Sequence, residues 1–245
     1  MAKQTEAVAK REEVMDLEEV PEFMKGDEGL GTENIGRDDV LMPRLNLAQG
    51  LSPELIEGDP KYIEGLKNGD AFNSLTGHIY GKGAIEVIII RADKPRAMEF
   101  DPTQRGVIKD FDVPLDDPRM EFTTDKEGKR KRPIATKFYE YVAIILPTRE
   151  VVALSFKGAA IKLTAKRLNG LIKAKSGRIP LFGVRYKLFP TLEQGPKGTY
   201  SVFRVENAGP VKDQELYQFA KFSFDSIKNA TVKIEREPGA DDDAD

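Results

Sequence analysis

The sequence predicts a mainly β, α+β fold with one core, and three observations predict it. Runs of β-branched and aromatic residues recur between residues 70 and 207 and are separated by turn residues. Two segments, 158–175 and 213–229, carry apolar residues at helical spacing instead. Removing the acid-rich ends leaves roughly 190 residues, which is ample for a single core.

Composition divides the chain into three ranges. Residues 1–38 are rich in acids without a sustained helical or strand period, so we expect a largely disordered N-terminal arm. Residues 39–232 are the predicted domain, which is entered through a segment where Pro43 and Pro53 prevent one continuous helix. Residues 233–245 contain a Pro-Gly break and an acidic run, and we expect a disordered tail.

The elements of the domain follow in order. Residues 70–80 are expected to form a first strand or a short hairpin. Strands are expected at 84–100, 137–146, 149–156, 179–192 and 199–207, and Pro147-Thr148 is the turn of a hairpin. Residues 101–136 form a long excursion rich in proline, aspartate and basic residues. The first helix carries the apolar stripe Ile161, Ala165, Leu168 and Ile172, and Asp213 is the expected N-cap of the second.

The predicted order of elements is strand, strand, strand, helix, strand, strand, helix. This is the order of an OB-fold. Hairpin connections imply antiparallel pairing, so we expect a five-stranded OB-fold-like barrel with a capping helix and a C-terminal helix. A doubly wound α/β fold needs helices between most strands, and the sequence lacks them.

Charge is distributed unevenly along the chain. The net charge is −3, yet residues 1–40 carry −7 and residues 235–245 carry −5, which leaves +9 for residues 41–234. Residues 151–192 hold nine Lys and Arg and no Asp or Glu. A basic body with acidic ends favours a polyanionic partner, and the ends can compete for the same surface.

Strand alternation suggests which residues meet such a partner. Arg185, Lys187 and Phe189 share one face of their strand, and Tyr200 and Arg204 share a face of the next, where pairing is expected to place them beside the first set. Lys137, Tyr139 and Tyr141 share a face of the strand at 137–146. Binders of single strands combine cations that follow phosphates with aromatic platforms for bases, which predicts a nucleic-acid-binding face.

Two further basic groups are candidates for the same surface. Lys162 and Lys166 lie on the polar face of the first helix and are expected to be peripheral contacts. Arg130, Lys131 and Arg132 belong to a basic run in the excursion that can clamp a strand, although the pattern also fits a flexible charged loop or a nuclear-localisation signal.

Several function classes are excluded or disfavoured. The absence of cysteine removes disulfides, thiolate zinc sites and cysteine nucleophiles, and a single histidine disfavours histidine metal sites and serine–histidine hydrolases. No signal peptide or membrane-length apolar run is present, which fits a cytoplasmic protein. Asp110, Asp112, Asp116 and Asp117 cluster without the spacing of a calcium loop, so no metal and no cofactor is predicted.

A predicted OB core with a basic, aromatic face, a following helix and an acidic tail resembles the T7-type single-stranded DNA-binding proteins of bacteriophages. The resemblance covers roughly residues 39–245 at the level of element order and composition. It implies non-catalytic, largely sequence-independent binding of single-stranded DNA in replication, recombination or repair, in the host cytoplasm, with partner proteins that dock on the tail. This chain ends Asp243-Ala244-Asp245, whereas that family commonly ends in a hydrophobic residue, so electrostatic competition is the better-supported role of the tail.

Two alternatives remain at this stage. The chain fits a protein–protein adaptor or inhibitor of a host enzyme that acts through its acidic arms. A metal-dependent nuclease using the Asp110–Asp117 cluster is less favoured. The sequence leaves open whether the chain forms a homo-oligomer.

Overall fold

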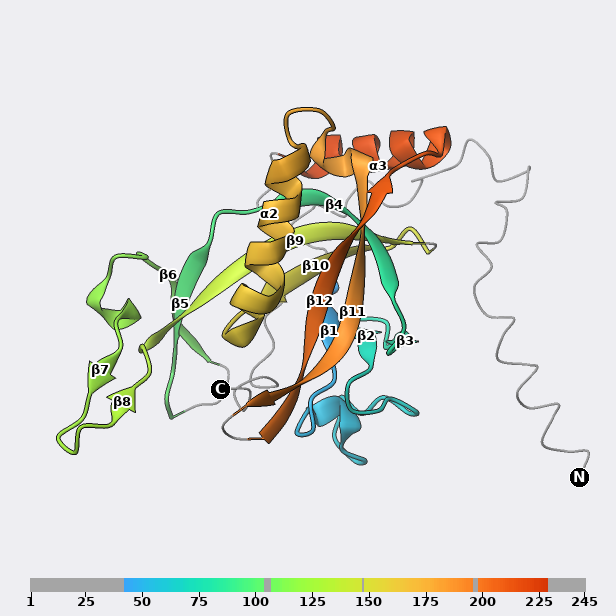
Figure 1. Cartoon of the computed structure of the whole chain (residues 1–245). Helices are drawn as coiled ribbons and strands as arrows, with labels where there is room; N and C mark the ends of the chain where they lie inside the picture. Colours follow the sequence, from blue (N-terminus) through green and yellow to red (C-terminus); the bar gives the residue numbers. More distant parts are fainter. Residues whose placement is uncertain (1–41, 104–106, 147, 196–197, 229–245) are drawn as a thin grey trace, which may run out of the picture. The chain divides into compact units, whose positions relative to one another are not determined.

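The computed structural model describes residues 42–103, 107–146, 148–195 and 198–228, all within the compact unit Leu41–Asp245 (Figure 1). Its strands are β1 Leu45–Leu47, β2 Ala71–Asn73, β3 Ile79–Gly81, β4 Ile85–Ala92, β5 Arg96–Phe100, β6 Ile108–Val113, β7 Thr123–Thr124, β8 Arg130–Lys131, β9 Ala135–Leu146, β10 Val151–Phe156, β11 Val184–Gly195 and β12 Gly198–Pro210. Its helical elements are η3 Pro53–Leu55, η4 Pro118–Met120, η5 Ile161–Ala165, α2 Lys166–Lys175, η6 Leu181–Gly183 and α3 Gln214–Ile227. The predicted acidic N-terminal segment, residues 1–38, and the predicted acidic tail, residues 233–245, lie outside the described residues.

The main sheet is antiparallel and is organised around β9. One edge of β9 pairs with β5 along residues 135–138 and with β4 along residues 141–146, and the other edge pairs with β10. The sheet continues from β4 to β11 and β12, and from β5 to β6. β4 and β5 therefore act as one bent strand, and the bend at residues 93–95 includes Pro95, which cannot donate to a strand ladder.

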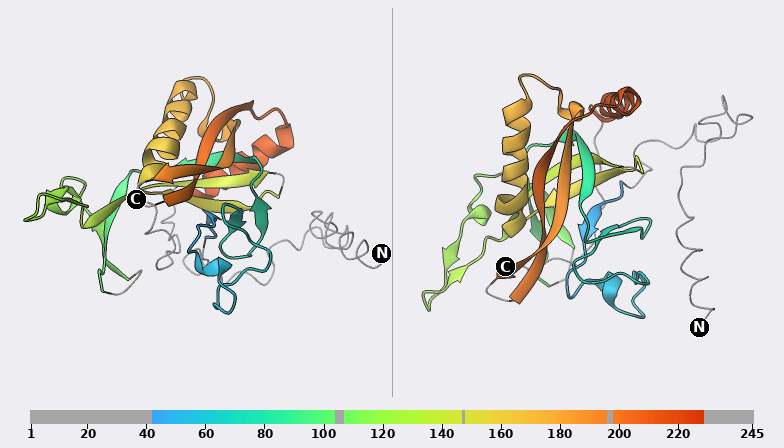
Figure 2. Two further views of the ribbon diagram at one scale, coloured as in Figure 1. Left: turned by 60° about the horizontal axis from the view of Figure 1, so that its bottom comes forward. Right: turned by 45° about the vertical axis from the view of Figure 1, so that its right-hand side comes forward.

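Helices cover both faces of this sheet (Figure 2). Val87 and Ile89 of β4 pack in the cluster that contains Leu168 of α2, whereas Ile88 and Ile90 pack in the cluster that α3 covers. Successive side chains point to opposite faces of a strand, so both sets must be apolar. Burial on two faces explains why the sequence of β4 is an almost unbroken β-branched run.

The α+β class is confirmed, but the predicted closed barrel is wrong, because the sheet is open. Among the described residues, β10 and β12 do not pair, and the segment 42–49 spans the space between them. On one side the Ala153 N–H of β10 donates to the Pro43 carbonyl at 2.8 Å. On the other, the Gln49 amide accepts from the Ser201 N–H and donates to the Ser201 carbonyl, both at 2.9 Å. This segment meets β10 through the isolated parallel bridge between Arg44 and Ala153, while β1 pairs with β2 in a separate three-stranded sheet.

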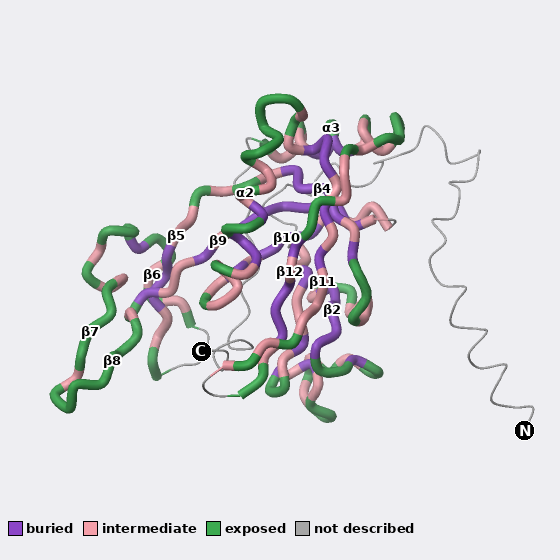
Figure 3. Tube along the Cα trace, viewed as in Figure 1, coloured by how far each residue is buried: buried purple, intermediate pink, exposed green. Residues whose placement is uncertain are grey.

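The excursion at 101–136 is more ordered than a loop. It contributes β6 to the sheet edge and then forms η4 and the two-stranded β7–β8 hairpin, which projects from the sheet (Figures 1 and 2) and is exposed (Figure 3). We call residues 107–134 the arm. Arg119 fastens it, because its guanidinium contacts Asp117 at 2.9 Å, Glu99 of β5 at 2.7 Å and Asp110 of β6 at 3.0 Å.

Both predicted helices are confirmed. Residues 159–175 are helical without a break, and η5 forms a π-helical turn near their start. The Asp213 carboxylate caps α3 by accepting from the Leu216 N–H at 2.6 Å, and the helix ends at Ile227. Within the part of the chain that the structure describes, no helix is long and apolar enough to cross a membrane.

Candidate nucleic-acid interface

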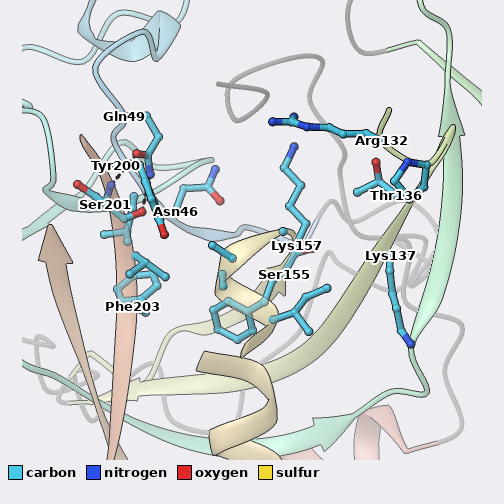
Figure 4. A pocket seen from close by; sticks show the side chains of 18 of the residues that line it. Asn46, Gln49, Arg132, Thr136, Lys137, Ser155, Lys157, Tyr200, Ser201 and Phe203 are labelled. Carbon is cyan, nitrogen blue, oxygen red and sulfur yellow. Dashed lines mark hydrogen bonds between the residues drawn. The ribbon is translucent and has the colours of Figure 1, made fainter. Parts of the chain in front are cut away.

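A cleft of about 670 Å³ lies beside the start of the α2 helical segment (Figure 4). Its walls come from elements far apart in the sequence. They are residues 45–49, the arm residues Met120 and Phe122, residues 132–137 before and at the start of β9, residues 155–161 at the end of β10 and beyond, and residues 200–203 of β12. The segment that spans β10 and β12 therefore also forms one wall of the cleft.

Three cations line the cleft. They are Arg132, Lys137 and Lys157, and the lining residues in the described part of the chain include no Asp or Glu. In Figure 4 the charged ends of Arg132 and Lys157 point toward one another, whereas Lys137 points away from them. A concave surface with cations and no carboxylate focuses a positive potential, which favours an anionic ligand.

Aromatic rings complete the walls, and they differ in accessibility. Phe156 and Phe203 are buried in the core, so their rings are already packed. Tyr200 is half-buried and Phe122 is exposed. The Arg130 guanidinium lies over the Phe122 ring, 3.7 Å from its centroid. Tyr200 and Phe122 are therefore the lining rings with solvent exposure, and Arg130 already occupies one face of Phe122.

The helical segment 159–175 begins on the cleft wall, where Ala159, Ala160 and Ile161 are lining residues. Peptide dipoles give the N-terminal end of a helix a partial positive charge. This end therefore adds to the positive potential of the three side chains.

The predicted cations of β11 have carboxylate partners. Arg185 contacts Glu86 of β4 at 3.1 Å, and the same carboxylate lies 3.4 Å from Lys187. The predicted alternation is confirmed, because the other face of β11 is buried at Val184, Tyr186 and Leu188. Residues 151–192 lack acids in the sequence, yet the neighbouring strand supplies one in the sheet.

The register of β11 with β12 differs from the expected one. Tyr200 lies opposite Glu193, near the other end of β11 from Arg185, so the expectation that pairing brings them together is wrong. Arg204 lies opposite the half-buried Phe189 and donates to Glu193 at 3.0 Å. The predicted face is thus divided, and only its Tyr200 end reaches the cleft.

The predicted face of β9 is correct, but one of its residues points into the core. The Lys137 ammonium lies 5.6 Å from the centroid of the Tyr139 ring, so these two share a face beside the cleft. Tyr141 is 1% exposed, and its hydroxyl donates to Asn169 of α2 at 2.8 Å. Burial raises the pKa of Tyr141. Contrary to the expectation, this ring offers no face to a base.

The remaining candidates lie at the surface. Lys162 of η5 and Lys166 of α2 are exposed, and so are Arg130 and Lys131 of β8. Arg132 follows β8 and belongs to the cleft wall. The basic run is therefore split, with its first two residues on the hairpin and its last residue at the cleft.

Two aspartates of the predicted cluster, Asp110 and Asp117, are held by the Arg119 guanidinium. Hydrogen bonds from Arg119 keep the pKa of Asp117 below its usual range, and a backbone N–H and Arg119 do the same for Asp110. No group of three or more His, Cys, Asp or Glu that could hold a metal ion occurs among the described residues. The arrangement explains the cluster as an anchor of the arm.

Sequence reasoning missed Lys157 and Gln49 as cleft residues. Lys157 lies in the acid-free range, and its place just before a predicted helix was the available signal. Gln49 carries no sequence signal, since its role depends on a contact with a strand 152 positions away.

Comparison with known proteins places the chain in a family. The family model described as Pam3 phage gp34-like protein matches residues 10–233. The chain belongs to the Pam3 phage gp34-like family. This assignment confirms a phage protein, while single-stranded DNA binding stays a prediction. A search of curated proteins and a search of solved structures found no match.

Proposed function

We propose that this Pam3 phage gp34-like protein binds single-stranded DNA without catalysis and largely without sequence preference, in support of phage DNA replication, recombination or repair. The observation that carries the proposal is the cleft, whose described lining combines three cations with accessible aromatic rings and contains no carboxylate. Its place of action would be the host cytoplasm, and replication or recombination proteins would be partners of the acidic tail.

The cleft chemistry suits a strand of nucleic acid. Arg132, Lys137 and Lys157 would contact phosphates, and the N-terminal end of the helix at Ala159 would add partial positive charge. Tyr200 and Phe122 would be stacking platforms, since stacking on an aromatic side chain tolerates every base. Tyr139, beside Lys137, is a further candidate.

The predicted cations of β11 and β12 already have carboxylate partners. Arg185 and Lys187 share the carboxylate of Glu86, and Arg204 is paired with Glu193. A phosphate would have to compete with these carboxylates, so we expect Arg185, Lys187 and Arg204 to contribute little to affinity.

Fluorescence anisotropy with labelled oligo-dT tests the proposal. The logarithm of the affinity should fall linearly with the logarithm of the salt concentration, with a slope of about −0.7 per phosphate contact, and duplex DNA should bind more weakly. The double variant Arg132→Gln/Lys157→Gln should weaken binding and flatten this slope, whereas Lys212→Gln, an exposed lysine outside the cleft, should change neither.

Equal affinity for duplex and oligo-dT, or affinity that does not respond to salt, would refute the proposal. Magnesium-dependent cutting of the oligonucleotide would support the nuclease alternative instead. Binding to a host enzyme without binding to DNA would support the adaptor alternative.

A further inference from the structure

We infer that the solvent face of the helix formed by η5 and α2 is a second contact surface for the same strand, along which the sugar-phosphate backbone continues after leaving the cleft. The inference rests on the proposed function. We call this surface the α2 stripe, and it consists of Lys162, Lys166, Gly170 and Lys173.

The cleft alone is too small for a whole binding site. Its volume of about 670 Å³ is that of a small-molecule pocket, so it holds only a short piece of a strand. Single-strand-binding OB folds cover about 4–16 nucleotides. The rest of a bound strand must therefore lie on surface that adjoins the cleft.

The α2 stripe adjoins the cleft and leads away from it. Ile161 lines the cleft wall, and Lys162 is the next residue of the helical run. The inward face of the run is held to the core by Ala165 and Leu168, which are fully buried. At 1.5 Å per residue, the run from Ile161 to Lys173 extends the path by about 18 Å.

The α2 stripe has a charge pattern that a merely solvated helix face lacks. Lys162 and Lys166 are four positions apart, a spacing at which like charges on a helix destabilise it. No Asp or Glu occurs in residues 151–192 to offset them, and none of the ion pairs found among the described residues involves Lys162, Lys166 or Lys173. The helix thus presents an unneutralised row of cations to solvent.

Gly170 leaves room for a ligand on this face. Glycine is the least favourable residue in a helix interior after proline. A Cβ built at Gly170 meets open space with no atom within 4 Å, so no packing contact explains the glycine. Between Lys166 and Lys173, the glycine leaves the helix backbone uncovered where a phosphate backbone can approach closely.

The π-helical turn at Ile161–Ala165 adds to this pattern. Such turns are rare and occur frequently at functional sites, because they change the direction of the side chains that follow. This one lies where the cleft wall passes into the α2 stripe.

The test compares the full chain with the double variant Lys166→Gln/Lys173→Gln in anisotropy titrations against oligo-dT of about 4 to about 16 nucleotides. Both proteins should bind the shortest strands equally. On the longest strands the variant should bind more weakly, and its salt slope should be smaller by about 1.4, or about 0.7 for each lost phosphate contact. The matched control Lys212→Gln/Lys221→Gln removes two exposed lysines elsewhere and should behave as the wild type.

Circular dichroism establishes that the variants are folded. If the stripe variant keeps the wild-type length dependence and salt slope, the inference is wrong and the proposed function stands. If the wild type binds no oligo-dT of any length, the proposed function itself fails. A loss of equal size on the shortest and longest strands would also overturn the inference, since it would place the lysines within the cleft site.

Discussion

Burial decides which individual aromatic side chains can take part in binding. Tyr139 and Tyr141 occupy alternate positions of β9, and the period of two correctly places them with Lys137 on one face. That period does not say how deep each residue lies along the face. Tyr141 is fully buried beneath α2, whereas Tyr139 is only partly buried against the same core cluster. No local sequence signal distinguishes the two tyrosines.

A pair of tyrosine variants separates binding from stability. Tyr200→Ala should weaken oligo-dT binding by about 1–3 kcal/mol, because it removes a stacking platform. Tyr141→Phe should leave affinity unchanged but lower the free energy of unfolding by about 1 kcal/mol, because the hydroxyl loses its bond to Asn169. Anisotropy and urea unfolding on both variants measure this, and a Tyr141→Phe protein with weaker DNA binding would contradict the assignment.

The strands and helices were predictable to the extent that their signals are local. Alternation in β11, the apolar run of β4, the helix at 159–175 and the Asp213 cap all follow from neighbouring residues. The neutralisation of Arg185 does not follow from neighbouring residues, because its partner Glu86 is 99 positions away in the sequence. The two residues come into contact only because β4 and β11 are neighbours in the sheet. A charge run in a sequence therefore indicates a basic surface only after the neighbouring strands are known.

The sequence predicted only a long excursion at the arm, because its β7 and β8 strands are short and because prolines and charged residues of both signs are frequent in it. What orders it is a contact between β5, β6 and η4 through Arg119. Hydrogen bonds from Arg119 lower the pKa of Glu99 and Asp117, so the ionised forms favour the folded arm. This contribution is present above the ordinary carboxyl pKa of about 4 and is lost as pH falls through the lowered values.

Arg119→Gln should therefore remove a pH-dependent part of the arm's stability. We expect wild-type amides of β5 and β6 to lose hydrogen-exchange protection as pH falls from about 5 to about 2, and the variant to show weak protection throughout. Arg149→Gln, which breaks the exposed pair with Glu215, is the control and should leave the arm's pH profile unchanged. An Arg119→Gln arm with the wild-type profile would show that other contacts hold it.

The described strands of the unit Leu41–Asp245 approach a barrel without closing one. Element order indicates strands that follow one another round a core, but it cannot say whether the first and last strands meet. Here Gln49 bonds Ser201 across the opening, and the cleft lies beside that contact. A ladder between β10 and β12 would occupy the space that the segment 42–49 and the cleft now fill. The open sheet is therefore what provides the candidate binding site.

The charge of the whole chain yields a last prediction. Deleting residues 235–245 removes a charge of −5 and changes the net charge from −3 to +2. Because that acidic run competes with DNA for a positive surface in our proposal, the truncated chain should bind oligo-dT more tightly at low salt. The difference should shrink as salt rises, since the Debye length falls from about 10 Å at 0.1 M to about 3 Å at 1 M.

A full-length chain with the six acids of 235–245 replaced by their amides separates charge from length. It should match the truncated chain in anisotropy titrations across the salt series, because the competition depends on charge. Wild-type affinity in both proteins at low salt would remove the competitive role of the tail while leaving the cleft proposal intact. Tighter binding by the truncated chain alone would indicate that the tail acts by occupying space.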